Sequence, residues 1–286
     1  MKLSIVTINR NNAFGLEKTL MSVASQTCKD FEHIIIDGSS TDNSVEVIKQ
    51  YVESTNKSSS KTCHQIKWIS EPDKGIYNAM NKGIRMALDG KADYIQILNS
   101  GDCLYAEDVI ERMFRALKDN DNPAIMYGNM IRDIPGKKHS TDKCLGQHDW
   151  TMYDFICGTI NHDPTYIRRD IYEKYGLYRE DLPITADWRW FVEAVALGGE
   201  KPVYVPIDVT LFDVSGISET QLERRELERD AELRKILPMS VYKDYRNYHF
   251  PIEQIKRLKR HPLAYKLFYL LERMLFKFEK WGILKK

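Results

Sequence analysis

Apolar and polar positions alternate in blocks along the first hundred residues of the chain. Four short apolar runs, of strand length and rich in β-branched or aromatic residues, alternate with segments whose apolar side chains recur at helical spacing. This βαβαβαβ order predicts an α/β protein with a mostly parallel, Rossmann-like sheet and helices on both faces. The expected strands are residues 3–8, 31–36, 66–69 and 94–98, and the expected helices are residues 15–26, 42–52 and 76–88.

The pattern continues less regularly after residue 103. It predicts a helix at 106–117, a strand at 124–130, a helix at 188–197 and a strand at 203–212. Residues 133–147 are basic, rich in turn formers and without periodicity, so we expect a loop there. We therefore expect one α/β domain over residues 1–218 and a C-terminal helical extension over residues 219–286.

The four expected strands of the first half all lead into polar residues. The first two end on Asn9 and Asp37, the third is followed by Asp73, and the fourth runs into Asn99-Ser100-Gly101-Asp102. Each cluster alone could serve as a turn. The carboxyl ends of parallel strands meet at one edge of an open sheet, where ligands bind, so their recurrence favours a binding cleft.

The residues of this cleft exclude two common nucleotide sites. No G-x-G-x-x-G follows the first strand and no G-x-x-x-x-G-K-[ST] occurs in the chain, which excludes a dinucleotide fingerprint and a P-loop. The cleft offers carboxylates and amides instead. These groups suit hydrogen bonds to a base and a ribose, together with one hard cation that bridges phosphates.

Composition and charge narrow the class of protein. The net charge is +1, so bulk charge does not predict a nucleic-acid binder. The five cysteines are odd in number and contain no Cys-x-x-Cys pair, which argues against a zinc site or a disulfide framework and favours a reducing compartment. No leader-like apolar segment opens the chain and no apolar stretch has the length of a membrane span, so we expect a cytoplasmic protein, soluble or peripheral.

Several segments of the first half resemble one enzyme family in their order and spacing. They are residues 3–9 (LSIVTIN), 22–27 (SVASQT), 31–42 (FEHIIIDGSSTD) and 71–83 (EPDKGIYNAMNKG). Together they resemble the inverting, nucleotide-sugar-dependent glycosyltransferases of family 2, which have the GT-A fold. The last segment is similar to a subgroup that builds bacterial surface polysaccharides, including colanic-acid-type enzymes. The resemblance is strong over residues 3–110 and looser to residue 218. It implies a nucleotide-sugar-binding half at 1–103 and an acceptor half at 104–218.

The resemblance also implies roles for polar residues of the first half. Four of them match positions that line the family's nucleotide pocket, namely Thr7, Asn9, Asp37 and Asp73. Of these, Asp37 is expected to face the base. Asn78 and Asn81 lie about one turn apart on the following helix, on the side of the donor phosphate or sugar. The alternative is that both are ordinary helix-surface amides.

Asn99-Ser100-Gly101-Asp102 occupies the place of the family's metal motif, D-x-D, and departs from it. The resemblance implies that Asp102 is the retained carboxylate for a divalent cation, Mn²⁺ or Mg²⁺, and that Asn99 and Ser100 bind the donor. An amide at position 99 gives the site one negative charge fewer. Its oxygen can still ligate a hard cation, and the donor pyrophosphate and water can fill other positions.

Residues 184–191 (ITADWRWF) contain the candidate catalytic base. An inverting transfer needs one carboxylate to take the proton from the attacking hydroxyl. The resemblance places Asp187 at the family's base position, whereas Asp before a helical pattern also suits an N-cap. His162, in the segment 160–169, is open to two interpretations, a satisfied structural histidine or an active-site contact.

The last part of the chain has its own character. Residues 251–286 carry ten Lys and Arg against three Glu, a net charge of +7. After Pro262, apolar side chains recur at helical spacing with basic residues beside them, as in a helix that lies on an anionic membrane surface. The alternative for residues 262–286 is packing on the catalytic domain or on a second copy of the chain in a homodimer.

The sequence thus predicts a glycosyltransferase that moves a sugar, with inversion, from a nucleotide-sugar donor, most simply a UDP-sugar. The expected acceptor is a saccharide or polyprenyl-linked saccharide of bacterial surface polysaccharide biosynthesis, at the cytoplasmic face of the inner membrane. A nucleotidyltransferase would need a glycine-rich basic loop after the first strand, and residues 9–12 do not provide one. The alternative from another class is a non-catalytic, nucleotide-binding or scaffold member of an assembly complex.

Overall fold

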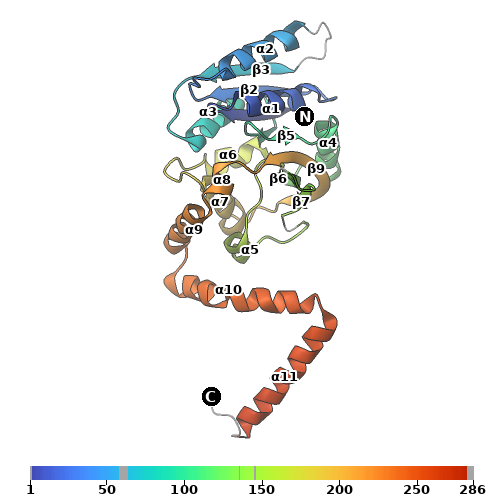
Figure 1. Cartoon of the computed structure of the whole chain (residues 1–286), viewed down its shortest axis with the longest axis vertical. Coiled ribbons are helices and arrows are strands. Elements are labelled where there is room, and N and C mark those ends of the chain that lie inside the picture. Colours follow the sequence, from blue (N-terminus) through green and yellow to red (C-terminus); the bar gives the residue numbers. More distant parts are fainter. Residues whose placement is uncertain (1, 58–63, 135, 145, 282–286) are drawn as a thin grey trace. The chain divides into compact units, whose positions relative to one another are not determined.

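The computed structural model describes residues 2–57, 64–134, 136–144 and 146–281 (Figure 1). The chain forms two compact units, residues 1–229 and residues 230–286. The first unit contains the whole described sheet, and the second unit is helical in its described part.

The apolar runs of the first half form the predicted parallel strands. They are β1 (Leu3–Asn9), β2 (Phe31–Asp37), β3 (Gln65–Ser70) and β4 (Tyr94–Ile97). These strands pair in parallel in the order β3-β2-β1-β4. Every residue of β1 and β2 is buried, because both faces of this sheet are covered, and this burial explains why their apolar runs are continuous.

Helices cover both faces of the parallel half. They are α1 (Ala13–Ala24), α2 (Ser44–Lys57) and α3 (Ile76–Leu88). Leu20 of α1 packs with Ile35 on one face, together with side chains of α2. Because side chains alternate along a strand, Ile36 points to the other face. There α3 comes so close that a Cβ on Gly83 would collide with Val6, so only glycine lets this helix lie directly on β1.

The rest of the sheet is mixed. Its strands are β5 (Cys103–Leu104), β6 (Ile125–Asp133), β7 (Ser140–Asp142), β8 (Thr165–Arg168) and β9 (Val203–Asp213). β8 is antiparallel to both β4 and β6, whereas β6 and β9 are parallel. The full order is β3-β2-β1-β4-β8-β6-β9-β5, with β7 paired to β6. The loop expected at 133–147 therefore contains a short strand, β7, which its irregular sequence does not indicate.

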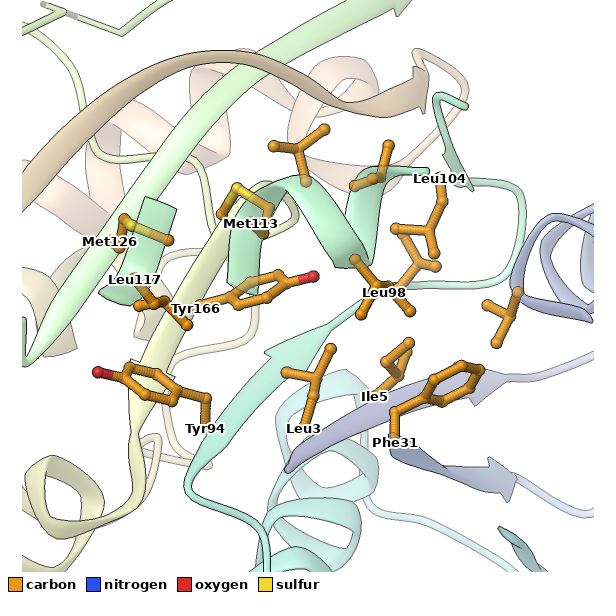
Figure 2. Packing of buried hydrophobic residues seen from close by; sticks show 14 of the residues in the cluster. Leu3, Ile5, Phe31, Tyr94, Leu98, Leu104, Met113, Leu117, Met126 and Tyr166 are labelled. Carbon is orange, nitrogen blue, oxygen red and sulfur yellow. The ribbon is translucent and has the colours of Figure 1, made fainter. Parts of the chain in front are cut away.

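A cluster of buried apolar side chains fixes the place where β4 ends (Figure 2). Leu98, which is fully buried, packs in this cluster with Leu3 of β1, Tyr166 of β8 and Met113 of α4 (Val109–Asp119). Strands and a helix thus meet around the residue that directly precedes the polar turn 99–102. This turn therefore starts from a rigid base.

The remaining helices lie in the second half of the chain. They are α5 (Met152–Cys157), α6 (Arg169–Tyr175), α7 (Ala186–Phe191), α8 (Ile217–Thr220), α9 (Leu222–Ile236), α10 (Met239–Lys259) and α11 (Pro262–Lys280). α7 continues as a wider, π-helical segment, Val192–Leu197. The helix predicted after Pro262 is α11, which has no buried side chain. Among the helices that the structure describes, none is both long and apolar enough to cross a membrane.

Candidate active site

A cavity of about 570 Å³ opens where β1, β4 and β9 end and α3 begins. Six of the residues predicted from the sequence line it: Asn9, Asp73, Asn99, Ser100, Asp102 and Asp187. The other four predicted residues do not line it: Thr7, Asp37, Asn78 and Asn81. The cavity therefore brings the metal-motif carboxylate and the candidate base together, although they are separated by more than eighty residues of sequence.

The turn that carries Asp102 is held by the neighbouring strands. The Ser100 amide donates to the Ile8 carbonyl oxygen over 3.0 Å, which continues the pairing with β1 beyond the end of β4. Asp102 is 3% exposed, and its Oδ1 accepts a hydrogen bond of 2.8 Å from the Asp213 amide at the end of β9. Burial raises the pKa of Asp102 well above its ordinary value, and the neighbouring carboxyl group of Asp163 raises it further.

Asp187 lies in the first turn of α7 and has a donor at each carboxylate oxygen. The Tyr77 hydroxyl is 2.8 Å from Oδ1, and His162 Nδ1 is 3.1 Å from Oδ2. Burial alone would raise the pKa of Asp187, but the contacts with His162 and Tyr77 outweigh it and bring the pKa below its ordinary value. The N-cap of α7 is Thr185, so the N-cap interpretation of Asp187 is wrong.

His162 pairs with Asp187 and also lies beside Asp163. Burial lowers the pKa of the His162 imidazole, but the Asp163 and Asp187 carboxylates outweigh burial and raise it well above its ordinary value. Asp187 is thus held as a carboxylate, which is the form that a general base requires.

The helix that carries Asp187 is fixed at its start by Glu228. Glu228 Oε1 accepts hydrogen bonds from the Ile184 amide (3.1 Å), the Thr185 amide (2.8 Å) and the Thr185 hydroxyl (2.7 Å). The next residue of α7, Trp188, is 1% exposed and donates its indole N–H to the Phe155 carbonyl oxygen over 2.7 Å. These contacts fix the position of the α7 backbone from which Asp187 projects.

Asp37 lies beside the cavity in a dense hydrogen-bond network. Its Oδ1 accepts from Asn9 Nδ2 (2.9 Å), and its Oδ2 accepts from the Ser40 amide (3.0 Å) and the Ser70 hydroxyl (2.7 Å). Burial raises the pKa of Asp37, but these hydrogen bonds outweigh it and lower the pKa below its ordinary value. Asn9 Oδ1 is buried without a partner in the described part of the chain, so it is an acceptor available to a ligand.

Asn78 and Asn81 make structural contacts rather than facing the cavity. Asn81 Nδ2 donates to the Tyr178 carbonyl oxygen (2.8 Å), and its Oδ1 accepts from the Tyr178 amide (3.0 Å). Asn78 Nδ2 donates to Glu180 over 2.8 Å. The two amides thus tie α3 to the segment after α6. Thr7 is also turned away from the cavity, with its hydroxyl 2.9 Å from His33 Nε2.

Three residues that contact the candidate catalytic groups were not among the sequence-predicted site residues: Tyr77, Asp163 and Asp213. Asp163 lies just before β8, and β8 is antiparallel to β4. Because the two strands run in opposite directions, the start of β8 lies beside the end of β4. The antiparallel pairing brings residues 162 and 163 to the carboxyl end of β4, and the sequence does not indicate this pairing.

The oxygens at the end of β4 suit a hard divalent cation. The Asp102 carboxylate lines the cavity, and Asn99 Oδ1 is buried without a hydrogen-bond partner in the described part of the chain. Over the described residues, no group of three or more His, Cys, Asp or Glu side chains is arranged to hold a metal ion. The residues fit a cation whose coordination is completed by oxygens of a bound diphosphate and water.

The family can now be identified. The family model described as glycosyl transferase family 2 matches residues 4–176. The chain belongs to this family. The family predicted from the sequence motifs and the predicted glycosyltransferase activity are thereby confirmed.

Curated relatives of this glycosyltransferase occur in mycobacteria. A PGL/p-HBAD biosynthesis glycosyltransferase of Mycobacterium tuberculosis (strain ATCC 25177 / H37Ra) is 26% identical over 243 residues, which cover 83% of this chain and 84% of the relative. An uncharacterized glycosyltransferase of M. tuberculosis (strain CDC 1551 / Oshkosh) is 28% identical over 218 residues, covering 75% and 76% of the two chains.

Solved structures confirm the GT-A fold. S. aureus TarS 1-349 in complex with UDP is similar with a TM-score of 0.61 at 16% identity, over 88% of this chain and 72% of that one. The mannosyltransferase PcManGT from Pyrobaculum calidifontis, in complex with GDP-Man and Mn²⁺, is similar with a TM-score of 0.62 at 14% identity, over 98% and 82%. In another TarS structure, this chain spans 42% of the length of the TarS chain.

Proposed function

We propose that this glycosyltransferase moves a sugar, with inversion, from a UDP-sugar to a saccharide or polyprenyl-linked saccharide in bacterial surface polysaccharide biosynthesis. The observation that carries the proposal is the shared cavity of Asp102 and Asp187, which provides a carboxylate for the leaving group and a carboxylate for the nucleophile. Complexes of structural neighbours with UDP, UDP-GlcNAc, GDP-Man and Mn²⁺ support a nucleotide-sugar donor.

In the proposed reaction, Asp187 accepts the proton of the acceptor hydroxyl as its oxygen attacks the anomeric carbon. A new bond forms between that oxygen and the anomeric carbon, and the bond between the anomeric carbon and the β-phosphate oxygen breaks. The nucleoside diphosphate leaves with the bonding electrons. One displacement from the opposite side of the sugar inverts the anomeric configuration.

Asp102 and Asn99 Oδ1 would hold a divalent cation, Mn²⁺ or Mg²⁺, whose chemistry is neutralisation of charge on the departing diphosphate. Among the other predicted donor-binding residues, Asn9, Asp73 and Ser100 line the cavity and would touch the donor directly. Thr7, Asn78 and Asn81 contact His33, Glu180 and Tyr178 instead and would not touch the donor. In this arrangement Asp37 fixes Asn9, whose free Oδ1 can accept a hydrogen bond from an N–H of the base.

The acceptor is proposed to reach the enzyme at a membrane. α11 exposes large apolar side chains, with Leu263 86% and Phe276 64% exposed, and carries several lysines and arginines beside them. A helix of this kind binds anionic lipid surfaces through burial of its apolar side chains and through attraction between its basic side chains and the lipid headgroups. We therefore propose a peripheral association of residues 262–286 with the cytoplasmic face of the inner membrane.

The proposal is tested first by calorimetric titration of the full chain with UDP, GDP and UDP-sugars, with and without Mn²⁺. We expect that Mn²⁺ increases the affinity for UDP and that Asp102→Ala decreases this affinity at least tenfold. Because Asn99 replaces a carboxylate of the metal motif, a non-catalytic scaffold is the second candidate. Failure of every nucleotide to bind would favour that scaffold.

A further inference from the structure

A row of four ionisable side chains links the two ends of the candidate active site. Asp102 neighbours Asp163, and Asp163 Oδ1 is 3.2 Å from His162 Nε2. His162 Nδ1 is in turn 3.1 Å from Asp187 Oδ2. His162 is therefore the link between the leaving-group carboxylate and the candidate base, and it lines the cavity itself.

The turn that carries His162 is fixed on the sheet. The Asp163 carbonyl oxygen accepts a hydrogen bond of 2.7 Å from Gln96 Nε2 of β4. The Pro164 carbonyl oxygen accepts one of 3.1 Å from the Gly128 amide of β6. Two strands thus hold the backbone directly after His162, so the imidazole projects from a fixed segment. Groups held on strands can orient a neighbour more accurately than groups on free loops.

Of the two side-chain donors to Asp187 among the described residues, His162 is the one whose donating nitrogen, Nδ1, has no second acceptor there. The Tyr77 hydroxyl is 2.8 Å from Asp187 Oδ1 but also 2.7 Å from the Ile184 carbonyl oxygen, and its single proton can be donated to only one of them at a time. In both the neutral form with a protonated Nδ1 and the charged form, His162 presents an Nδ1–H to Asp187. The His162 contact with Asp187 Oδ2 is therefore not shared with another acceptor at Nδ1.

We propose that His162 is a positioning residue for the glycosyl transfer, which holds Asp187 through Nδ1 in the orientation needed for deprotonating the acceptor. At the other ring nitrogen, Nε2 lies at ion-pair distance from Asp163 Oδ1 (3.2 Å) and 3.1 Å from Asn99 Nδ2. A protonated Nε2 pairs with Asp163, whereas an unprotonated Nε2 accepts a hydrogen bond from Asn99. This inference rests on the proposed function, because it assigns a role in a reaction whose base is Asp187.

Three substitutions separate the two nitrogens of the ring. His162→Asn places an amide N–H near the position of Nδ1, His162→Gln places one near the position of Nε2, and His162→Ala removes both. A matched control is His148→Asn, because His148 pairs with Asp154 at 3.1 Å but does not line the cavity. The full chain of each variant is assayed for release of nucleoside diphosphate from UDP-glucose, UDP-galactose, UDP-GlcNAc and GDP-mannose, and for UDP binding by calorimetry.

His162→Ala is expected to lower kcat on the order of 10²-fold, the usual effect of misplacing a catalytic group. The KM for the nucleotide sugar and the Kd for UDP should change less than threefold. His162→Asn should recover at least tenfold of the lost kcat, whereas His162→Gln should recover none of it. A better rescue by Gln, or a parallel loss of UDP binding, would overturn the positioning role. Loss of activity in Asp187→Asn with full activity in His162→Ala would refute this inference and leave the proposed function standing.

The contact can also be observed without turnover. Nitrogen-15 NMR of the histidine rings in the full chain should give a His162 Nδ1 that carries a proton and shifts when Asp187 is replaced by asparagine. The assignment follows from the signal lost in His162→Gln. A His162 Nδ1 without a proton, or one that is insensitive to Asp187→Asn, contradicts the proposal even if no donor supports catalysis.

Discussion

The carboxylates in and beside the cavity differ in their partners, and these partners decide whether the pKa of each group is raised or lowered. Asp37 is buried and Asp187 is partly buried, yet contacts with neighbours lower the pKa values of both carboxyl groups below the ordinary range. Asp102 has fewer donors and a second carboxyl group beside it, and its pKa is raised. A cation placed against Asp102 would reverse that balance, because a positive charge favours the ionised form.

The substitution Asp187→Asn tests the base assignment. Asparagine keeps the size of the side chain but cannot accept the proton of the acceptor hydroxyl, so transfer should fall by about 10²- to 10⁴-fold, the usual contribution of a general base. UDP binding should stay within threefold of the wild type in calorimetry. The control is Asp170→Asn, which removes an exposed carboxylate paired with Arg168 at 2.7 Å, away from the cavity. Full transfer activity in Asp187→Asn would show that another group is the base.

Two buried histidines make stability depend on pH. His33 Nδ1 lies 2.9 Å from the Tyr51 hydroxyl, which lies 2.7 Å from His64 Nε2. Burial lowers the pKa of His33 to about 3 and that of His64 to about 4, while in the unfolded chain both titrate near about 6.5. The unfolded state therefore binds more protons below that value, so stability is complete above it and is lost as the pH falls.

Urea unfolding at pH 7 and pH 5 measures this loss. Each histidine should lower the free energy of unfolding by up to about 1.4 kcal/mol per pH unit in this window. His64→Gln should reduce the difference between pH 7 and pH 5 relative to the wild type, and the comparison cancels the contribution of the carboxylates. An unchanged pH dependence in the variant would mean that His64 titrates normally in the folded protein.

At the scale of elements, the sequence predicts the parallel half of the sheet well, because β1, β2 and β4 are apolar on both faces and end on polar turns. It predicts less of the second half. Strands as short as β5 and β7 have no readable period, and nothing local indicates that β8 is antiparallel. The sequence therefore predicts that the polar ends of β1 and β4 meet in one cleft, whereas it leaves His162, in the turn before β8, open between a structural and an active-site role.

The sequence also does not predict contacts between side chains and loops that lie far away along the chain. Asn78 and Asn81 donate hydrogen bonds to the segment after α6. No sequence pattern in α3 distinguishes amides that face a ligand from amides that tie the helix to a loop. The wrong N-cap interpretation of Asp187 has a similar origin, since Thr185 and Asp187 are both acceptable caps by residue type. Only the backbone of α7 decides between them.

The element that supports the base gives a further prediction. In Glu228→Ala, two amides and a hydroxyl at the start of α7 lose their acceptor. Unsatisfied buried donors should lower the free energy of unfolding by about 1–3 kcal/mol. The variant's kcat should fall more than its affinity for UDP. Glu228→Gln retains an acceptor oxygen and should recover most of the lost stability and most of the lost kcat. Glu223→Ala should behave as the wild type, because Glu223 is exposed and lies in α9, the helix that also carries Glu228. Equal kcat in all three variants would contradict the role of Glu228.

At the scale of the whole molecule, the chain separates catalysis from its candidate membrane contact. The cavity and all residues that line it belong to the first unit, residues 1–229. The exposed apolar side chains and basic residues of α11 belong to the second unit, residues 230–286. Catalysis and membrane contact can therefore be removed independently by substitutions in the first unit and in the second unit.

Deletion of residues 262–286 tests the membrane contact. The truncated chain should sediment less with vesicles that contain phosphatidylglycerol, because it loses both the apolar surface and the basic side chains of α11, each of the latter worth on the order of 1 kcal/mol. UDP binding should be unchanged. A variant with Lys266 and Lys277 replaced by glutamate keeps the helix and most of its apolar surface but should also lose binding, and 0.5 M salt should weaken binding of the wild type. Undiminished vesicle binding after the deletion would refute the contact. A full-length dimer that becomes monomeric on truncation would instead identify α11 as the contact between two copies of the chain.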